Sequence, residues 1–548
     1  MDSPIKKDQK RQTPLGKSEG GSSKSAKNAR GRRQNRWSAV RRVLAGLSLL
    51  AVTALFLDLS GALHGWLGWL AKLQLLPAIM AANFAVIAGI AVVTLLFGRI
   101  YCSVICPLGI FQDGVSWLSG LCPGKRLPGG KRSGGSKRLR FSWKPERKWL
   151  RYGILGLFVL AFIFGVHVLV AVLAPYSAYG RMVGNLLQPL WIWGNNLLAK
   201  IAEHYEGYAF YTRDVWMKSL PTFIVAAVTF VVLSVLAWWN GREYCNSICP
   251  VGTTLGFLSR FAMFRPVIDA DKCKDCRMCE KGCKSSCIDI ANHNIDYSRC
   301  VDCLNCLDAC KFDALHYKFA WRKTAASEVV AASSDDKPAD PGRRAFLTGT
   351  AMVAGAMTLN AQAQKFDGGF ARVLPKREPE RKGRLVPSGA RSANDFYSRC
   401  TACGLCVAAC PNGVLRPSSD LEHLMQPYMS FERGYCRPEC TECSKVCPAG
   451  AILPITPEEK TDISIGIAEV NYELCIVNRD EVNCGNCARH CPTGAIHMVK
   501  QEGSEFRIPS VDASRCIGCG RCEYLCPSRP LSAILVNGRE KHVNSSES

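Results

Sequence analysis

The sequence lacks the fingerprints of nucleotide- and flavin-binding enzymes. No G-x-G-x-x-G follows a predicted strand, and the Gly-Lys-Ser triplet at residues 16–18 has no upstream glycine to form a phosphate loop. No C-x2-C-H is present either, which excludes covalently attached c-type haem. The chain therefore carries no recognisable bond-making centre of its own, and any redox chemistry must belong to bound groups.

Acidic residues are scarce near the N-terminus. Residues 1–42 hold thirteen Lys or Arg against three Asp or Glu, with almost no apolar side chain before Trp37. This composition predicts a disordered basic tail over residues 1–39. The formal net charge of +24 could suggest nucleic acid, but no recognition motif follows the tail and an apolar run does. We expect no nucleic-acid partner.

Cysteine, in contrast, is abundant, with 30 residues in a chain of 548. Many of these cysteines recur as C-x2-C-x2-C-x3-C, the spacing that is typical of iron–sulfur proteins. A disulfide framework would not require such regular spacing. The cysteines therefore predict several iron–sulfur clusters.

Four apolar runs are close to the ~20 residues that a membrane-spanning helix needs. They predict a four-span helical membrane domain over residues 40–262 and lie at residues 40–57, 75–97, 150–174 and 220–239. The loop at 98–149 holds eleven Lys or Arg against two Asp or Glu, whereas the loops at 58–74 and 175–219 are nearly neutral. The positive-inside rule then puts the N-terminus and the 98–149 loop in the cytoplasm.

A cysteine pair follows the second and the fourth apolar runs. GRIYCSVICPLG at residues 98–109 and GREYCNSICPVG at residues 241–252 share eight of twelve positions, so the domain contains two repeated hairpins. Positions i and i+4 share a helix face, so each pair directs its two sulfurs one way. We expect the four thiols to form one redox or iron–sulfur site at the membrane edge, from Cys102, Cys106, Cys245 and Cys249. Inert buried thiols and structural disulfides are alternatives, although disulfides are rare on the reducing side of a membrane.

His167 is an ionisable residue inside the third apolar run. An intramembrane histidine is a functional candidate, here as a contact for quinone. Such a residue can also hydrogen-bond a neighbouring helix carbonyl, and no second span histidine is present to form a haem pair. The role of Cys122 stays open.

Residues 263–320 contain two complete ferredoxin motifs, so we expect a two-cluster domain. The motif cysteines are Cys273, Cys276, Cys279 and Cys283, followed by Cys300, Cys303, Cys306 and Cys310. The fourth cysteine of each motif ligates the other cluster in two-cluster ferredoxins, so Cys310 should join the first trio and Cys283 the second. Lys284 and Lys311 stand where a proline is usual, and Cys287 offers a rival ligand. A zinc ribbon is a weaker alternative, because zinc sites use paired C-x2-C units.

A polar, small-residue stretch at 321–341 predicts a flexible linker. Residues 342–364 follow with paired arginines, Arg343 and Arg344, a short weakly apolar stretch and a small-residue motif at 361–363. This pattern resembles a twin-arginine export signal, with a fifth apolar segment or an ordinary cytoplasmic helix as alternatives. A connector at 365–398 leads to the last domain.

Residues 399–535 carry sixteen further cysteines in four groups, and residues 536–548 are predicted to be a tail. Sixteen thiolates would hold four [4Fe–4S] clusters, so we expect about six clusters in the whole chain. The predicted ligands in this domain are Cys400, Cys403, Cys406, Cys410, Cys436, Cys440, Cys443, Cys447, Cys475, Cys484, Cys487, Cys491, Cys516, Cys519, Cys522 and Cys526.

The whole arrangement resembles a fusion of two ferredoxin-type proteins, the NapH/MauN membrane protein and the NapG/MauM exported protein. The first resemblance covers residues 40–320 and rests on YCSVICPLG, YCNSICPVG and the two cluster motifs that follow. The second covers residues 342–535 and rests on the paired arginines, LVPSGARSANDFYSRCTACGLC and the later cysteine groups. The implied fold is a helical membrane domain with two α+β ferredoxin-like polycluster domains.

Related four-cluster proteins also imply a pairing of the cysteine groups, outer with outer and inner with inner. Cys526 would then complete the site of Cys400, Cys403 and Cys406, and Cys410 that of Cys516, Cys519 and Cys522. Likewise, Cys491 would join Cys436, Cys440 and Cys443, and Cys447 would join Cys475, Cys484 and Cys487.

The resemblance implies electron transfer between the quinol pool or a cytoplasmic donor and a periplasmic oxidoreductase or cytochrome. We expect a multi-pass protein of the bacterial inner membrane, at most a quinol dehydrogenase subunit. Its first ferredoxin domain would lie in the cytoplasm and its second in the periplasm. Two other classes are alternatives. A CcoG-like metal reductase or assembly factor would not need exported clusters, and a NosR-like membrane regulator should carry a flavin-binding domain, of which the sequence has no motif.

Overall fold

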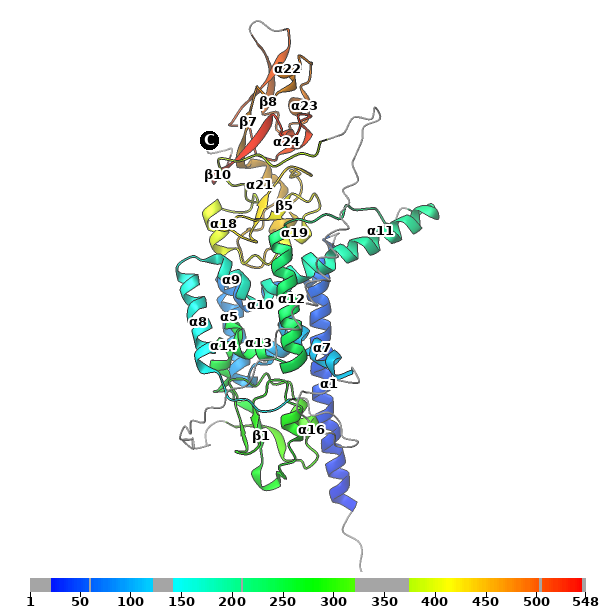
Figure 1. The fold of residues 1–548 in the computed structure, drawn as a ribbon, viewed down its shortest axis with the longest axis vertical. Coiled ribbons are helices and arrows are strands. Elements are labelled where there is room, and N and C mark those ends of the chain that lie inside the picture. Colours follow the sequence, from blue (N-terminus) through cyan, green and yellow to red (C-terminus); the bar gives the residue numbers. More distant parts are fainter. Residues whose placement is uncertain are drawn as a thin grey trace, which may run out of the picture.

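The computed structural model describes residues 21–58, 61–121, 141–207, 210–320, 374–501 and 505–544. A helical domain lies in the middle of an elongated molecule (Figure 1). The first ferredoxin domain lies at one end of it and the C-terminal ferredoxin domain at the other. Cys122, the linker at 321–341 and the twin-arginine-like segment at 342–364 lie outside the described residues.

The helical domain is built from helices of very different length. Its elements are α1 (Gly21–Leu57), α2 (Ala62–Leu67), α3 (Trp69–Lys72), α4 (Leu75–Met80), α5 (Phe84–Phe97), α6 (Ile100–Val104), α7 (Pro107–Leu121), α8 (Lys148–Ile163), α9 (His167–Leu173), α10 (Pro175–Met182), the π-helix η1 (Val183–Leu187), α11 (Gln188–His204), α12 (Leu220–Asn240), α13 (Glu243–Ser247) and α14 (Pro250–Ser259). α1 begins at Gly21, inside the stretch that the composition predicts as a disordered tail.

Two of the described helices could cross a membrane by length and composition, the Trp37–Leu57 part of α1 and all of α12. The other two apolar runs from which spans are predicted are each divided into two helices, α4 and α5 in one and α8 and α9 in the other. Between α4 and α5, Ala82 has a φ of 52° and the Asn83 side chain accepts a hydrogen bond from the Val86 N–H, which starts a new helix. Between α8 and α9, Gly165 adopts a φ of 72°.

The two hairpins that the repeat predicts are present and interlock. Each long helix ends at a glycine with positive φ, Gly98 at 73° after α5 and Gly241 at 66° after α12. A five-residue helix follows, α6 or α13, and a proline then begins the returning helix, α7 or α14. α7 packs against α12 and α14 packs against α5, so each returning helix lies on the long helix of the other repeat.

The first ferredoxin domain is a small α+β unit. Strand β1 (Phe264–Ile268) pairs antiparallel with β4 (Leu315–Phe319), and β2 (Ile288–Asp289) pairs with β3 (Asn294–Ile295). The connecting helices are η2 (Ala270–Lys272), α15 (Met278–Lys281) and α16 (Asn305–Ala309). Its own core includes the cysteines and Ile288, Ile295 and Leu307.

The C-terminal domain repeats this construction and is larger than the sequence predicts. Its elements are α18 (Ala393–Arg399), α19 (Leu405–Ala409), β5 (Leu415–Pro417), β6 (Pro427–Met429), α20 (Glu442–Val446), α21 (Pro457–Asp462), β7 (Ile463–Val470), α22 (Ile476–Arg479), α23 (Asn486–Arg489), β8 (Ile496–Lys500), β9 (Arg507–Val511), α24 (Arg521–Leu525) and β10 (Ile534–Asn544). The predicted tail is wrong, because β10 continues to Asn544 and pairs with β7. The connector also contributes to the core through Leu385 and Val386, which are buried.

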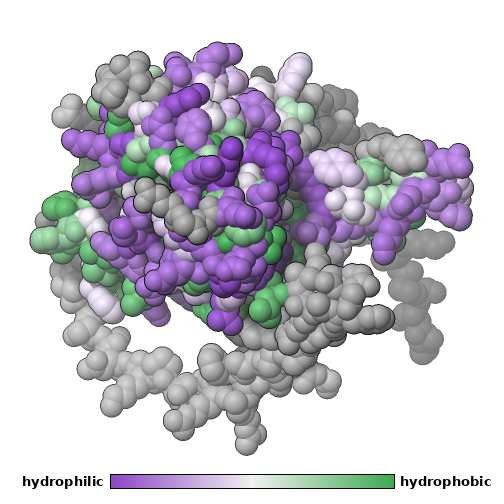
Figure 2. All heavy atoms as spheres, turned by 90° about the horizontal axis from the view of Figure 1, so that it is seen from above, coloured by the Kyte–Doolittle hydropathy of each residue, from purple (hydrophilic) through white to green (hydrophobic). Residues whose placement is uncertain are grey.

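The C-terminal domain docks directly on α10 of the helical domain. A Cβ at Gly180 would lie 2.3 Å from the carbonyl oxygen of Cys403, so only glycine permits this approach. The Arg181 side chain donates to the carbonyl of Ala402 at 3.3 Å. Nearby, the Trp216 ring lies between the guanidinium groups of Arg416 and Arg433, at 4.6 and 4.7 Å. Viewed along the long axis, the C-terminal end of the molecule is predominantly hydrophilic (Figure 2).

Candidate iron–sulfur sites

The eight motif cysteines of the first ferredoxin domain gather in two small pockets. One pocket is lined by Cys273, Cys276, Cys279 and Cys310, and the other by Cys283, Cys300, Cys303 and Cys306. Each pocket therefore combines three cysteines of one motif with the fourth cysteine of the other. Cys287 also lines the second pocket, and its sulfur lies 3.5 Å from that of Cys283.

The sixteen cysteines of the C-terminal domain form four groups of four. Each group combines three cysteines of one motif with one cysteine of a motif that neighbours it in the sequence. One pocket is lined by Cys410, Cys436, Cys440 and Cys443, and another by Cys475, Cys484, Cys487 and Cys526. Cys447 lies beside Cys400, Cys403 and Cys406. Cys491 lies beside Cys516 and Cys519, with Cys522 completing the group.

This geometry corrects the outer-with-outer pairing that the resemblance implies. Cys526 belongs with the third motif and not the first, and Cys410 belongs with the second and not the fourth. The physical reason is local: each pair of motifs folds as one compact unit, and the strand pair β8–β9 joins the third motif to the fourth. Four converging sulfurs at each site still fit a [4Fe–4S] cluster.

Burial disfavours the ionised, thiolate form of these cysteines, so a bound cation is required to stabilise it. Burial raises the pKa of Cys279, Cys303 and Cys403 to about 11 each. At neutral pH such thiols keep their protons unless positive charge stabilises the thiolates. Iron supplies that charge, so the chemistry of the donor set agrees with its geometry.

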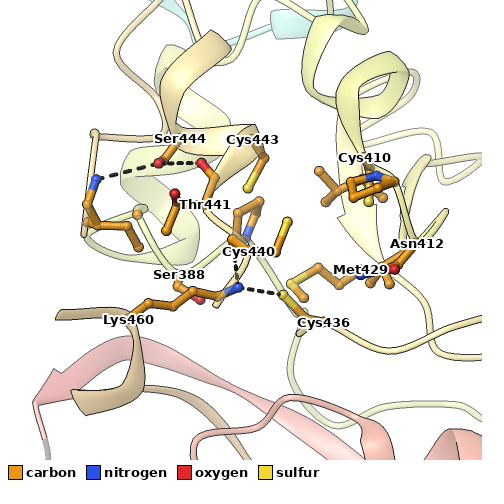
Figure 3. A pocket seen from close by; sticks show the side chains of 16 residues that line it. Ser388, Cys410, Asn412, Met429, Cys436, Cys440, Thr441, Cys443, Ser444 and Lys460 are labelled. Carbon is orange, nitrogen blue, oxygen red and sulfur yellow. Dashed lines mark hydrogen bonds between the residues drawn. The ribbon is translucent and has the colours of Figure 1, made fainter. Parts of the chain in front are cut away.

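The site of Cys436 includes a buried lysine (Figure 3). Lys460 is 6% exposed, and its ammonium donates to the Cys436 sulfur at 3.2 Å and to the carbonyls of Arg437 and Cys440. The lysine lies in the last turn of α21 and has no carboxylate in ion-pair contact among the described residues. A cation in this position stabilises an anionic cluster.

The repeat in the helical domain brings all four of its cysteines together in a buried core. Cys106 and Cys249 each lie close enough to Cys102 and Cys245 to interact electrostatically. The Gln112 amide donates to the Cys245 sulfur at 3.2 Å, and the Gly252 N–H donates to the Cys249 sulfur at 3.4 Å. The four thiols of the repeated motif therefore form one site, which we call the repeat site.

Positive charge surrounds the repeat site. Arg99 and Arg242 are both fully buried, at 0% exposed. Arg242 pairs with Asp113 at 2.8 Å, and Asp113 also meets Arg41 at 3.6 Å and Lys284 at 3.4 Å. One carboxylate therefore faces three cations beside the repeat site, which leaves a surplus of positive charge next to the four sulfurs.

Lys284 also explains a departure from the usual motif. Its ammonium reaches Asp113, while its backbone carbonyl accepts a hydrogen bond from the Arg242 N–H at 3.0 Å. The Arg99 N–H in turn donates to the Asp302 carboxylate at 3.0 Å. Through these contacts Lys284 joins the first ferredoxin domain to the repeat site. A proline at position 284 would lack the ammonium and so could not pair with Asp113.

His167 begins α9 and is half-buried, with no side-chain hydrogen-bond partner among the described residues.

Sequence reasoning missed the arginines of the repeat site, although Arg99 and Arg242 are among the identities of the repeat. It also missed Lys460, for which the sequence contains no comparable signal.

Comparison with known proteins agrees with the cysteine geometry. A family model described as a 4Fe-4S binding domain matches residues 79–126 and again 219–267, one copy of the repeated motif in each. A model described as a 4Fe-4S dicluster domain matches residues 399–451 and 482–529, and another of that description matches 296–414. The first two of these dicluster matches each contain two neighbouring motifs, as the geometry pairs them. No solved structure matches the chain.

The curated relatives are ferredoxin-type proteins. The methylamine utilization ferredoxin-type protein MauM of Methylophilus methylotrophus is 33% identical over 197 residues, which is 34% of this chain and 83% of the relative. The ferredoxin-type protein NapG of Escherichia coli is 34% identical over 197 residues, or 81% of its length, and NapF of that organism is 25% identical over 170 residues. These matches confirm the second resemblance, and the chain belongs to the MauM/NapG family of ferredoxin-type iron–sulfur proteins.

Proposed function

We propose that this protein is a membrane electron relay that carries electrons between its two ends through the repeat site. One observation supports this function above all others. The domains that carry the cysteine sites follow one another along the long axis of the molecule (Figure 1), and neighbouring sites lie within electrostatic range of each other or are separated by two buried tyrosines. Iron–sulfur clusters bound there would supply one-electron redox chemistry, and the chain would set their order and surroundings.

The first ferredoxin domain leads to the repeat site. Cys279 and Cys306, from its two pockets, lie within electrostatic range of each other. Cys303 of the second pocket is close to Lys284 and Asp113, which border the repeat site. The eight cysteines would hold two clusters, with Cys310 and Cys283 as the exchanged ligands.

The C-terminal domain continues the path. Cys406 neighbours Cys443, which joins the site of the first motif to that of the second. The Cys436 N–H donates to the Cys519 carbonyl at 3.0 Å, which joins the second motif to the fourth. Cys522 then neighbours Cys487 of the third motif. Four clusters would form a row that begins beside α10.

The step between the repeat site and this row crosses two tyrosines. Tyr101 is buried beside Cys102, Cys106 and Cys249, and Tyr176 is buried beside Cys403. The two phenols also lie within electrostatic range of each other. With a seventh cluster or another metal centre in the repeat site, every step of the path would run between adjacent groups.

Exposed apolar side chains support a membrane around the helical domain. Trp37 stands at the start of the apolar part of α1, and Trp149 and Trp239 stand at the ends of α8 and α12; the three side chains are 65%, 79% and 58% exposed. Trp66 and Trp191, at 84% and 53% exposed, belong to the opposite connections. Exposed tryptophans at both ends of an apolar layer are typical of the two membrane interfaces. Four spans, two of them divided, would then cross the bilayer.

The basic 98–149 loop favours a cytoplasmic first ferredoxin domain, so the C-terminal domain would face the periplasm of a bacterial inner membrane. The quinol pool or a cytoplasmic donor would reduce one end, and a periplasmic oxidoreductase or cytochrome would accept electrons at the other. His167 would contact quinone. Protease protection of the C-terminus in spheroplasts tests the orientation. The C-terminus should be accessible in the native chain and protected in the R343K/R344K variant, and protection in both would overturn it.

The relay itself is tested in proteoliposomes with an impermeant reductant on the side of the first ferredoxin domain. The C-terminal clusters should become reduced in the native chain and in a Ser247→Ala control, but at least about tenfold more slowly in Cys245→Ser. Equal rates in Cys245→Ser, at full iron content of the other sites, would contradict the path.

A further inference from the structure

The site nearest the helical domain receives polar groups from outside its own domain. This site, which we call the proximal site, consists of Cys400, Cys403, Cys406 and Cys447. Three side chains reach it from α10 and from the residues before α12: Tyr176 and Arg181, which are 2% and 3% exposed, and Lys218, which is partly buried. None of them belongs to a cysteine motif.

Two of these side chains are cations without an acidic partner. Arg181 donates to the carbonyls of Ala402 and Ala171, and Lys218 donates to the carbonyl of Val407 and the side chain of Gln188. No carboxylate among the described residues lies within ion-pair distance of either. A buried cation with only neutral partners is energetically costly, because its charge has lost the solvation of water. Arg181 interacts electrostatically with Tyr244 and with Cys403, and Lys218 interacts with Cys410 of the neighbouring site and with Cys406 of the proximal site.

The third side chain is a hydroxyl without a partner. Tyr176 is 2% exposed and its phenol oxygen makes no hydrogen bond within the described residues. Its nearest ionisable neighbours are Cys403, Cys447 and Tyr101. Buried hydroxyls nearly always have a partner, so this one lacks the acceptor that a sulfur of a bound cluster would provide.

We propose that Tyr176, Arg181 and Lys218 tune the reduction potential of the cluster at the proximal site, raising it when the C-terminal domain is docked. This inference rests on the cluster binding proposed above. Reduction adds one electron and one negative charge to a cluster that is already anionic. Positive charge and hydrogen-bond donors stabilise the reduced form more than the oxidised form, so they raise the potential. These three are positioning residues, because they act on the cluster and do not bind its iron.

The test is an EPR-monitored redox titration of the iron-loaded, full-length chain in detergent. The signal of the proximal cluster is identified by its loss in Cys403→Ser. In Arg181→Gln and Tyr176→Phe, that one signal should titrate at a more negative potential, and the other signals should not move. A tenfold decrease in the equilibrium constant for reduction of the cluster corresponds to a shift of ~59 mV for one electron. Arg181→Lys should restore most of the native potential.

Lys382→Gln is the matched control. Lys382 belongs to the C-terminal domain, as the proximal site does, but its side chain is 81% exposed and pairs with Glu469 at the surface. The control variant should leave every potential unchanged. Unchanged potentials in both Arg181→Gln and Tyr176→Phe, at full iron content, would overturn the inference without affecting the proposed clusters. If Arg181→Gln loses iron, the potentials of Tyr176→Phe and Lys218→Gln decide the question. An unchanged proximal potential in both of these variants would then overturn the inference. Absence of iron from the native chain would instead overturn the proposed function.

Discussion

Arg99 and Arg242 reach across the repeat to each other's cysteine motif. The Arg99 Nη2 donates to the carbonyl of Cys245 at 3.1 Å, and the Arg242 Nη1 donates to the carbonyl of Cys102 at 2.6 Å. The glycines behind these carbonyls are equivalent too: a Cβ would lie 2.4 Å from the Cys102 oxygen at Gly109 and 2.2 Å from the Cys245 oxygen at Gly252. Each half of the repeat thus fixes the backbone of the other.

Replacing Arg242 should destabilise the helical domain strongly. Arg242→Gln removes the closest of the three cations around Asp113, which is 12% exposed, and the hydrogen bond to the Cys102 carbonyl. Breaking a fully buried pair by removing one partner costs about 3–5 kcal/mol, and because Arg41 and Lys284 still face Asp113 we expect a loss near the lower end of that range. Denaturant unfolding in detergent measures the change. Arg479→Gln, which removes an exposed pair with Asp480, should be indistinguishable from the native chain. Similar unfolding of the two variants would contradict the role of Arg242.

A methyl group at position 180 should separate the C-terminal domain from the helical domain. In Gly180→Ala, the new Cβ would lie 2.3 Å from the Cys403 carbonyl and 2.6 Å from the Phe56 ring, so the two surfaces must move apart. Hydrogen exchange should increase in α10 and around Cys403. Gly184→Ala is the control, since no atom lies within 4 Å of its added Cβ. Equal exchange in the two variants would show that the contact is not tight.

The purified chain should contain about twenty-four irons and as many labile sulfides, for six [4Fe–4S] clusters. Occupation of the repeat site by a seventh cluster would raise the iron to about twenty-eight, and a Cys102→Ser/Cys245→Ser variant should lose only the added four. Metal and sulfide analysis with EPR spectra measures both. Stoichiometric zinc, with less than about eight irons per chain, would exclude the iron–sulfur assignment.

Cys287 should be dispensable for cluster binding. Cys283, Cys300, Cys303 and Cys306 already provide four sulfurs at this site, and Cys287 is a fifth. We expect Cys287→Ser to keep all the iron and Cys303→Ser to lose the cluster of that pocket. Iron content and the EPR signals of the two variants distinguish them. Loss of four irons in Cys287→Ser would make Cys287 the ligand in place of Cys283.

Regular cysteine spacing predicted where the iron–sulfur motifs lie, and the family matches confirm ferredoxin-type domains. It could not predict which motifs pair in the C-terminal domain, because that depends on which neighbours fold together, as β8 and β9 do. Hydropathy located the apolar runs but missed the breaks at Ala82 and Gly165, since single residues with positive φ leave the average hydropathy unchanged. The contacts of Arg181 and Lys218 with the C-terminal domain depend on how the two domains dock, which the local sequence does not predict.

The interlocked hairpins have a consequence for the ancestry of the helical domain. One hairpin alone would carry two thiols, an arginine whose acceptor carbonyl is missing, and a returning helix with no long helix to cover it. Two copies of such a hairpin, related by a two-fold axis, would satisfy all of these groups at once. A single hairpin would therefore need a second copy of itself to satisfy these groups, and the two halves in this chain are no longer equivalent: Gly256 stands in the second half where the first has Asp113.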